Sequence, residues 1–398
     1  MSSRDLELRH SAGTYQKRNL SVVRGEGIYL FGDDGKSYID CIGGIGTAIL
    51  GHAHPELVAA IADQANTVMA LPEMLCNPVR ADLQHKLLSF FPESFQRIFL
   101  CNSGTEAIEG ALKFAKFSTK KSGVIALKRG YHGKTMGSLS VTSDEKYRSP
   151  FEPLVPGAHF ASPIRVDDIA STFQRAAAGE IPEIAAFIFE PIQGETGVFP
   201  LGQEFIKEAT AIARSHGALI ICDEIQSGMG RSGKMWAHEH LGITPDLVCI
   251  AKAIGGGVPM GAIAIGDKII DLPVRIHTST FGGNPLACRA SLAVLEALLR
   301  DKLIENAARI GEYIMTEIRG LGIPSIREVR GKGLMIGIEL KEHAGPYLEA
   351  CTREGLLCLL AGQRVIRLLP PLIISESEAA TVVDLLRRAL SNPAHQPL

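Results

Sequence analysis

The chain has 398 residues, with 41 lysines and arginines against 43 aspartates and glutamates, and 46% of its residues are hydrophobic. At about 100–200 residues per domain, this length corresponds to two or three structural units with ample core. A formal net charge of −2 excludes the strong basic bias that proteins use to bind nucleic acid or an anionic membrane. We therefore expect a globular protein with neither of these partners.

Targeting signals and cysteine usage bear on the compartment. Residues 1–10 contain no apolar segment of the kind a signal peptide has, and no apolar run reaches the roughly 18 residues that span a bilayer. The eight cysteines are scattered, and several, such as Cys222 and Cys249, lie in apolar runs where a thiol packs as a small apolar group. We expect reduced thiols and a cytoplasmic protein. The alternative is a disulfide framework or a zinc site.

The elements that we expect up to residue 285 alternate between two types. A hairpin is predicted around Asp33-Asp34-Gly35, where two short apolar stretches flank a turn signal. Helical patterns follow at 105–117 and 203–216. Between them lie short, nearly continuous apolar runs, typical of strands buried on both faces, at 97–100, 124–127, 185–189, 218–222, 247–251 and 262–265. This alternation favours a doubly wound α/β fold.

The pattern changes after residue 285. Two long helices are predicted at 287–300 and 302–320, followed by strands at 326–330 and 333–340. A further helix, a strand at 365–369 and a final helix at 376–390 complete the chain. These elements predict a smaller α+β unit.

Two carboxylates, Asp223 and Glu224, end the apolar run at 218–222. The carboxyl edge of an open α/β sheet is where ligands bind, and a buried carboxylate is costly unless a cation or hydrogen-bond donors meet it. One hypothesis is that a carboxylate meets a cofactor cation. The alternative is that it caps the following turn.

Lys252 stands after the next apolar run and before three consecutive glycines. An amine beside an apolar strand end can lose its proton, as a lysine that forms a Schiff base must, and glycines let the backbone approach a flat ligand. The alternative is a solvated lysine at a strand-to-loop junction. About one helix and one strand separate Lys252 from Asp223, so their side chains could emerge from neighbouring strand ends.

A third segment, Ser103-Gly104-Thr105, lies between the run at 97–100 and a helical pattern. Hydroxyls, free backbone N–H groups and the helix dipole favour a phosphate there, although ordinary helix capping would use the same residues. A carboxylate, an amine and a phosphate site at strand ends are what pyridoxal 5′-phosphate requires. The carboxylate keeps its ring nitrogen protonated, and the lysine carries its aldehyde.

The motifs of the chain, taken together, resemble the class III (ω-amino-acid) aminotransferases of the acetylornithine and ornithine group, including relatives in lysine biosynthesis that act on a carrier-bound chain. The motifs are Gly51-His-Ala-His-Pro, Asn102-Ser-Gly-Thr-Glu-Ala, Gly130-Tyr-His-Gly-Lys-Thr, Glu190-Pro-Ile-Gln-Gly-Glu-Thr-Gly-Val, Asp223-Glu-Ile-Gln-Ser-Gly-Met-Gly-Arg, Lys252-Ala-Ile-Gly-Gly-Gly, Thr278-Ser-Thr-Phe-Gly-Gly-Asn-Pro, Gly331-Lys-Gly-Leu-Met-Ile-Gly and Arg367-Leu-Leu-Pro-Pro. The resemblance covers about residues 15–390. It implies fold type I, with a large cofactor domain at 49–285 around a mainly parallel seven-stranded sheet. Residues 1–48 and 286–398 would form a small α+β domain, and two copies would share their active sites.

The resemblance also implies roles for individual residues. Lys252 would bind the cofactor aldehyde and Asp223 its ring nitrogen. The other members of the cofactor pocket would be Ser103, Gly104, Thr105, Tyr131, His132, Glu190, Ile225, Gln226 and, from the neighbouring subunit, Thr280. Among these, Ser103, Gly104, Thr105 and Thr280 would hold the phosphate, Tyr131 and Ile225 would cover the two ring faces, and Gln226 would reach the phenolic oxygen.

Substrate recognition is expected at Arg367 and Glu195. An arginine within the apolar strand 365–369 needs a planar anion as its partner, and the resemblance implies the α-carboxylate of glutamate. Glu195 resembles a gate that pairs with this arginine while an ω-amino substrate is bound. The alternatives are a structural ion pair for Arg367 and an ordinary loop carboxylate for Glu195.

The substrate itself is less defined by the sequence. Lys134 occupies a position that is typically arginine in acetylornithine and ornithine enzymes, where it helps to hold the far carboxylate, and a lysine lacks the bidentate fork. Acetylornithine or a close analogue is the leading expectation, with 2-oxoglutarate and glutamate as the second pair. Ornithine, lysine, putrescine-type amines and a chain on an amino-group carrier protein are the alternatives. A decarboxylase, an aminomutase or a non-catalytic protein on the same scaffold also remains open.

Metal binding is not expected. The pairs His52 and His54, and His238 and His240, are spaced i, i+2 and have no third ligand nearby in the sequence.

Overall fold

A mixed sheet of seven strands forms the centre of the larger part of the molecule. The computed structural model describes residues 3–391. The strands of this sheet are β4 (Phe95–Cys101), β5 (Gly123–Leu127), β6 (Ala158–Ala161), β7 (Ile184–Phe189), β10 (Leu219–Asp223), β11 (Leu247–Ile250) and β12 (Gly261–Gly266). Their order is β4-β12-β11-β10-β7-β5-β6, and β12 alone among them runs against its neighbours. The carboxyl ends of the six other strands therefore meet at one edge.

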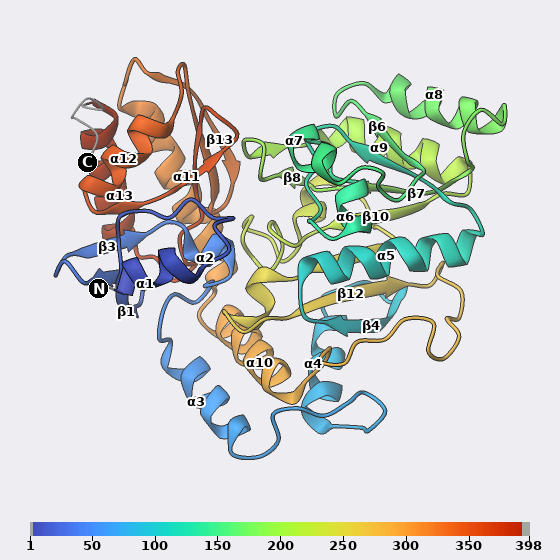
Figure 1. The fold of residues 1–398 in the computed structure, drawn as a ribbon, viewed down its shortest axis with the longest axis horizontal. Coiled ribbons are helices and arrows are strands. Elements are labelled where there is room, and N and C mark those ends of the chain that lie inside the picture. Colours follow the sequence, from blue (N-terminus) through green and yellow to red (C-terminus); the bar gives the residue numbers. More distant parts are fainter. Residues whose placement is uncertain (1–2, 392–398) are drawn as a thin grey trace.

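Both faces of this sheet are buried, which explains why its strands are continuously apolar. Successive side chains of a strand point to opposite faces. Ile221 accordingly packs in one apolar cluster and Ile220 in the other. One face is covered by the long helix α5 (Gly104–Thr119), visible across the sheet in Figure 1. Elements packed against the other face include α4 (Pro78–Leu88), α8 (Val166–Ala177) and α9 (Gln203–Ser215).

The two ends of the chain share a second sheet. Strands β1 (Val22–Glu26), β2 (Tyr29–Gly32) and β3 (Ser37–Asp40) are antiparallel, and β3 pairs in parallel with β15 (Leu356–Leu357). A third sheet has the order β13-β14-β17-β16, formed by Ile326–Lys332, Met335–Leu340, Val365–Leu368 and Leu359–Ala361 respectively. Figure 1 shows the blue N-terminal strands beside the red C-terminal elements. The domain boundaries near residues 48 and 285 stay predictions.

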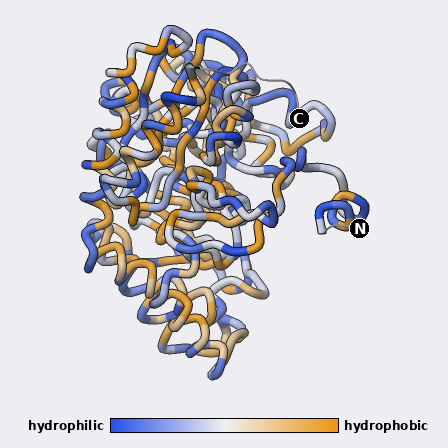
Figure 2. The backbone as a smooth tube through the Cα atoms, turned by 90° about the vertical axis from the view of Figure 1, so that its left-hand side faces the viewer, coloured by the Kyte–Doolittle hydropathy of each residue, from blue (hydrophilic) through white to orange (hydrophobic). Residues whose placement is uncertain are grey.

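Helices complete this arrangement. The helix α10 (Pro285–Arg300) packs on α3 (Pro55–Ala65) and on α4, and α11 (Leu303–Gly320) packs on β13 and on α13 (Glu376–Ser391). The N-terminal helix α1 (Ser3–His10) buries no side chain and stands away from the body of the molecule (Figure 2). The short elements are α2 (Gly43–Gly46), α6 (Met136–Ser140), α7 (Glu145–Arg148), α12 (Gly345–Arg353), β8 (Ile192–Gln193), β9 (Phe199–Pro200) and the 3₁₀ turns Ser149–Phe151, Ala237–Leu241 and Lys252–Gly255.

The predicted α/β fold class is confirmed. All six strands predicted before residue 285 are present, and the hairpin around Asp33-Asp34-Gly35 is the β2–β3 pair. The edge strand β6 was not predicted, because three of its four side chains are only partly buried and it lacks an apolar run. Among the described residues, no helix is long and apolar enough to cross a membrane.

Candidate active site

Lys252 and Asp223 emerge from neighbouring strands at the carboxyl edge of the large sheet. Strands β10 and β11 are parallel, and Asp223 pairs with Cys249, three residues before Lys252. Burial lowers the pKa of the Lys252 amine, and the negative charge of Asp223 opposes this shift. Lys252 also has a φ of 47°, a left-handed conformation that is costly for a residue with a side chain. The amine is thus partly buried, poised to lose its proton and held by a strained turn.

Asp223 is buried and held by two donors. Its Oδ2 atom lies 2.7 Å from Nδ1 of His132, and its Oδ1 atom accepts from the backbone N–H of Ile225 at 3.0 Å. Burial alone would lower the pKa of His132, but the hydrogen bond and the charge of Asp223 outweigh it and raise that pKa. A carboxylate offers about four lone-pair sites, so Asp223 retains acceptor capacity for a protonated ring nitrogen. The sequence did not predict the contact with His132.

The segment predicted to bind phosphate lies at the start of α5. Ser103 is the N-cap residue, and its hydroxyl accepts from the N–H of Glu106 at 3.3 Å. The Thr105 hydroxyl lies 2.6 Å from that of Ser138. A Cβ atom on Gly104 would lie 2.8 Å from Cδ1 of Ile225, so only glycine allows this close approach. The first N–H groups of α5 and this side-chain packing fit a phosphate with an adjoining ring.

Tyr131 and Glu190 follow the neighbouring strands β5 and β7. Tyr131 is partly buried, and its backbone N–H donates to Oε1 of Glu190 at 2.8 Å. Burial, with the charges of Glu195 and Glu190, raises the pKa of Tyr131 to about 12, so its ring stays neutral. The ring of Tyr147 meets Tyr131 edge-on, and the exposed Lys134 places its Nζ 4.7 Å from the Tyr147 ring centroid.

Arg367 approaches the same edge from the smaller part of the molecule. It stands on β17, is only 2% exposed, and its Nη1 contacts Oε2 of Glu195 at 3.0 Å. The same Nη1 lies 3.0 Å from the Gly194 carbonyl and 3.2 Å from Oε1 of Gln226. Arg367 and Glu195, the residues of the expected gate, are thus in contact, and their role as a gate stays a prediction. The Gln226 contact was not predicted, because Gln226 lies in the turn after β10, whereas Arg367 lies on β17 of another sheet.

Thr280 lies apart from these groups. It is exposed on the loop between β12 and α10. This loop is tied to the phosphate segment, because Nδ2 of Asn102 donates to the hydroxyl of Ser279 at 3.0 Å.

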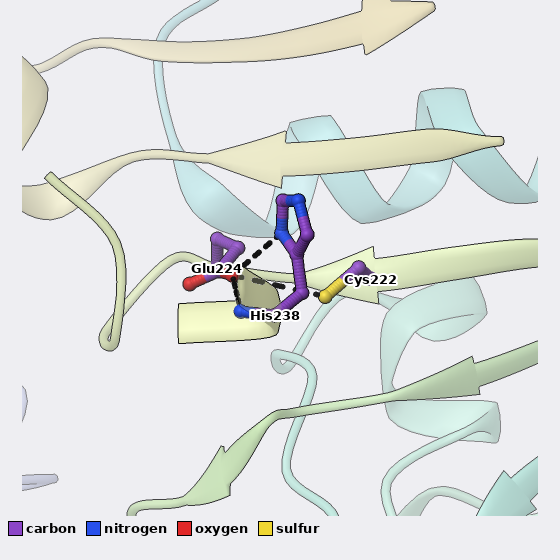
Figure 3. Close-up of side chains that lie close together, drawn as sticks. All are labelled: Cys222, Glu224 and His238. Carbon is purple, nitrogen blue, oxygen red and sulfur yellow. Dashed lines mark hydrogen bonds and ion pairs between the residues drawn. The ribbon is translucent and has the colours of Figure 1, made fainter. Parts of the chain in front are cut away.

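A second buried cluster contains Cys222 and Glu224, the two chain neighbours of Asp223, together with His238 (Figure 3). Glu224 accepts from the backbone N–H of His238 at 2.7 Å and from the Ser227 hydroxyl at 2.7 Å, and its Oε1 lies 2.9 Å from Nδ1 of His238. Cys222, Glu224 and His238 are close enough to meet one metal ion. Burial, however, raises the pKa of the Cys222 thiol well above its ordinary value, and the thiolate is the form that binds metals. The contacts describe a hydrogen-bonded support for the Asp223 segment, which the sequence did not reveal.

The predicted histidine pairs have separate partners. His52 lies 2.8 Å from Oδ2 of Asp40, whereas His240 contacts the Ser232 carbonyl at 3.1 Å through Nε2.

Comparisons with known proteins show the family and the fold. The profile of the family Aminotransferase class-III matches residues 11–390. The [LysW]-aminoadipate semialdehyde transaminase of Deinococcus radiodurans is 45% identical over 97% of this chain and 89% of its own length. The acetylornithine aminotransferase of Archaeoglobus fulgidus is 39% identical over 96% of this chain and 98% of its own. Among solved structures, an ornithine aminotransferase from Toxoplasma gondii with partial occupancy of pyridoxal phosphate has a TM-score of 0.91 and 28% identity, covering 98% of this chain and 93% of that one.

Proposed function

Because the chain belongs to the class III aminotransferases, an enzyme family that uses pyridoxal phosphate, we propose that it moves the terminal amino group of an ω-amino substrate to 2-oxoglutarate, forming glutamate, or catalyses the reverse reaction. The observation that carries this proposal is the Arg367–Glu195 pair, because a gated arginine lets one site accept two different amines. When bound, pyridoxal phosphate supplies an aldehyde that joins to amines and a ring that withdraws electrons.

Other residues near Lys252 would hold the cofactor, and Lys252 itself would move a proton. Ser103, Gly104 and Thr105 would hold the phosphate at the start of α5, and Asp223, held in place by His132, would hold the ring nitrogen. The Nζ atom of Lys252 would take the proton from the substrate carbon that bears the amine and would give it to the carbon of the cofactor's aldehyde group. Its lowered pKa supports this role, because a general base must be unprotonated at working pH.

Arg367 would bind the α-carboxylate of glutamate. Its guanidinium is buried, and its Nε atom has no hydrogen-bond partner within the described chain, so a planar carboxylate could satisfy it. When the ω-amino substrate is bound, Glu195 would cover Arg367, as it does in this structure. The side chain of Glu195 is 31% exposed, which leaves it room to turn away.

For the substrate, we propose acetylornithine or a close analogue. The name of the relative from Archaeoglobus fulgidus supports acetylornithine, whereas that of the relative from Deinococcus radiodurans supports a semialdehyde on a carrier protein, the second candidate. Lys134 bears on the choice. It is exposed, and among the described residues no carboxylate lies within ion-pair distance of it, so it is free to meet an anion at the pocket entrance.

A half-reaction panel tests the proposal. Purified holoenzyme is mixed with glutamate, acetylornithine, ornithine, lysine, putrescine or carrier-linked lysine, and the absorbance of the cofactor is followed. We expect glutamate and one ω-amino substrate to convert the cofactor to its amine form. If glutamate and another α-amine converted the cofactor but no ω-amino substrate did, the proposal would be contradicted.

We also propose a homodimer. Apolar side chains are exposed on the loop between α3 and α4 and beside Thr280, including Met74 at 87% and Phe281 at 63%. Burial in a partner would remove this surface from water and could bring Thr280 to the partner's phosphate. Sedimentation should give twice the chain mass. We further place the enzyme in the cytoplasm, as all eight cysteines are free thiols.

A further inference from the structure

Glu190 connects two loops that carry different parts of the site. It directly follows β7, is buried, and uses both carboxylate oxygens. Oε1 accepts from the backbone N–H of Tyr131 at 2.8 Å, and Oε2 accepts from that of Gly194 at 3.2 Å. One side chain therefore fixes the tyrosine proposed to cover the cofactor ring and the residue that precedes the gate.

The Gly194 peptide links Glu190 to Arg367, the residue proposed to recognise glutamate. While its N–H donates to Glu190, its carbonyl accepts from Nη1 of Arg367 at 3.0 Å. A Cβ atom at Gly194 would lie 2.3 Å from Oε1 of Gln226, so the backbone packs directly on that amide. Displacing the Gly194 peptide would therefore displace the acceptor that orients Arg367.

The backbone of the gate residue is held on its other side as well. The Glu195 carbonyl accepts from the N–H of Gly362 at 3.1 Å, and the hydroxyl of Thr196 donates to the Arg129 carbonyl at 3.0 Å. The Glu195 side chain is by contrast partly exposed. The main chain at 194–196 is thus fixed at several points, and the side chain of the gate is the part free to move.

A carboxylate is an expensive choice for the position of Glu190. Strands β7 and β10 are parallel, and Phe189 pairs with Cys222, so Glu190 and Asp223 follow paired residues. Burial raises the pKa of Glu190 to about 7, helped by the Asp223 charge and opposed by that of His132. Lys252 also faces this group. Two acceptor atoms aimed at two N–H groups are what a carboxylate offers and a glutamine does not.

We propose that Glu190 is a positioning residue that holds the backbones of Tyr131 and Gly194 in fixed positions relative to each other. The gate then opens by rotation of the Glu195 side chain alone. This inference rests on the proposed function. It predicts that weakening Glu190 harms the glutamate half-reaction, which needs Arg367 exposed and well placed, more than the half-reaction of the ω-amino substrate, which does not use Arg367.

The test compares holoenzyme variants in the two half-reactions. Glu190→Gln retains one acceptor oxygen for two N–H groups, and we expect the KM for glutamate to rise about tenfold, because one of the two buried hydrogen bonds is lost. The KM for the ω-amino substrate should change by less than about threefold on the same basis. If Glu190→Gln does not fold, Glu190→Asp serves instead, because its shorter side chain cannot reach both donors and should act in the same direction.

Asp246→Asn is the matched control. Asp246 is also buried and accepts a backbone N–H, that of Ile220 at 2.8 Å, but it lies at the opposite end of β10. Its variant should leave the ratio of the two half-reactions unchanged. An unchanged KM for glutamate in the folded Glu190 variant would overturn the inference, as would equal losses in both half-reactions. If the unmodified enzyme converts no ω-amino substrate, the proposed function fails first, and the inference fails with it.

Discussion

Replacing Glu195 by glutamine tests the gate directly. In the structure, Oε2 of Glu195 lies 3.0 Å from Nη1 of Arg367, and the guanidinium is almost fully buried. Under the proposed function, glutamate must displace this contact before its own carboxylate can bind Arg367. Its measured affinity is therefore its intrinsic affinity reduced by the fraction of molecules whose gate is open. Glu195→Gln keeps the size of the side chain but removes its charge, so the closed gate should be less populated.

The size of the effect follows from the type of hydrogen bond. The glutamine can still accept a hydrogen bond from the charged guanidinium but no longer forms an ion pair with it, and we expect the closed gate to lose about 1.4 kcal/mol, on the order of one charge-assisted hydrogen bond. That difference is about a factor of ten in an equilibrium constant. The KM for glutamate should fall by up to about tenfold. Discrimination between the terminal amine and the α-amine of the ω-amino substrate should fall as well. An uncovered Arg367 can hold the α-carboxylate of that substrate and present its α-amine to Lys252.

The assay is the conversion of the cofactor by glutamate and by the preferred ω-amino substrate, measured for both enzymes at several concentrations. Glu354→Gln is a suitable control, because Glu354 is exposed to a similar degree and pairs with Arg388 at 3.4 Å on the surface. It should change neither KM. A KM for glutamate that stays constant or rises in folded Glu195→Gln would refute the gate.

Two further predictions concern the cofactor pocket. His132→Gln should lower the free energy of unfolding by about 2 kcal/mol at low pH, because Asp223 loses a charged donor. Since the pKa of His132 is raised in the folded state, this stabilisation is complete below the ordinary histidine pKa and disappears as the pH rises through the raised value. Urea denaturation over a pH series measures the difference in the free energy of unfolding between the unmodified protein and the variant. A difference that increases with pH would contradict the pairing of His132 with Asp223. Gly104→Ala should weaken cofactor binding about tenfold in a fluorescence titration, because its Cβ would press on Ile225. Gly320→Ala, where a Cβ would meet no atom within 4 Å, should bind as the unmodified protein does.

The sequence was most informative about the large sheet. Its strands are buried on both faces, so residues such as Ile220 and Ile221 must both be apolar although they point in opposite directions. Such runs are visible without any knowledge of the fold. The positions of Lys252 and Asp223 at strand ends followed from the same runs.

The contacts between distant segments could not be predicted from these runs. His132 reaches Asp223 only because β5 and β10 both lie beside β7 in the sheet, an order that no local pattern specifies. The partners of Glu190 likewise lie on two different loops. In the sequence, Glu224 stands out only as the neighbour of Asp223, and His238 only as a histidine in an i, i+2 pair. Their hydrogen bond depends on how the chain folds back after β10.

The pairing of β3 with β15 has a consequence for biosynthesis. A ribosome releases β3 among the first segments of the chain, but the strand that completes its sheet emerges only near the end, shortly before the strand that bears Arg367. A nascent chain can thus assemble the large sheet, with its lysine and aspartate, while the arginine for glutamate is still missing. Premature termination between β15 and Arg367 would yield a chain that contains the other residues proposed to bind the cofactor but lacks the arginine proposed to bind glutamate.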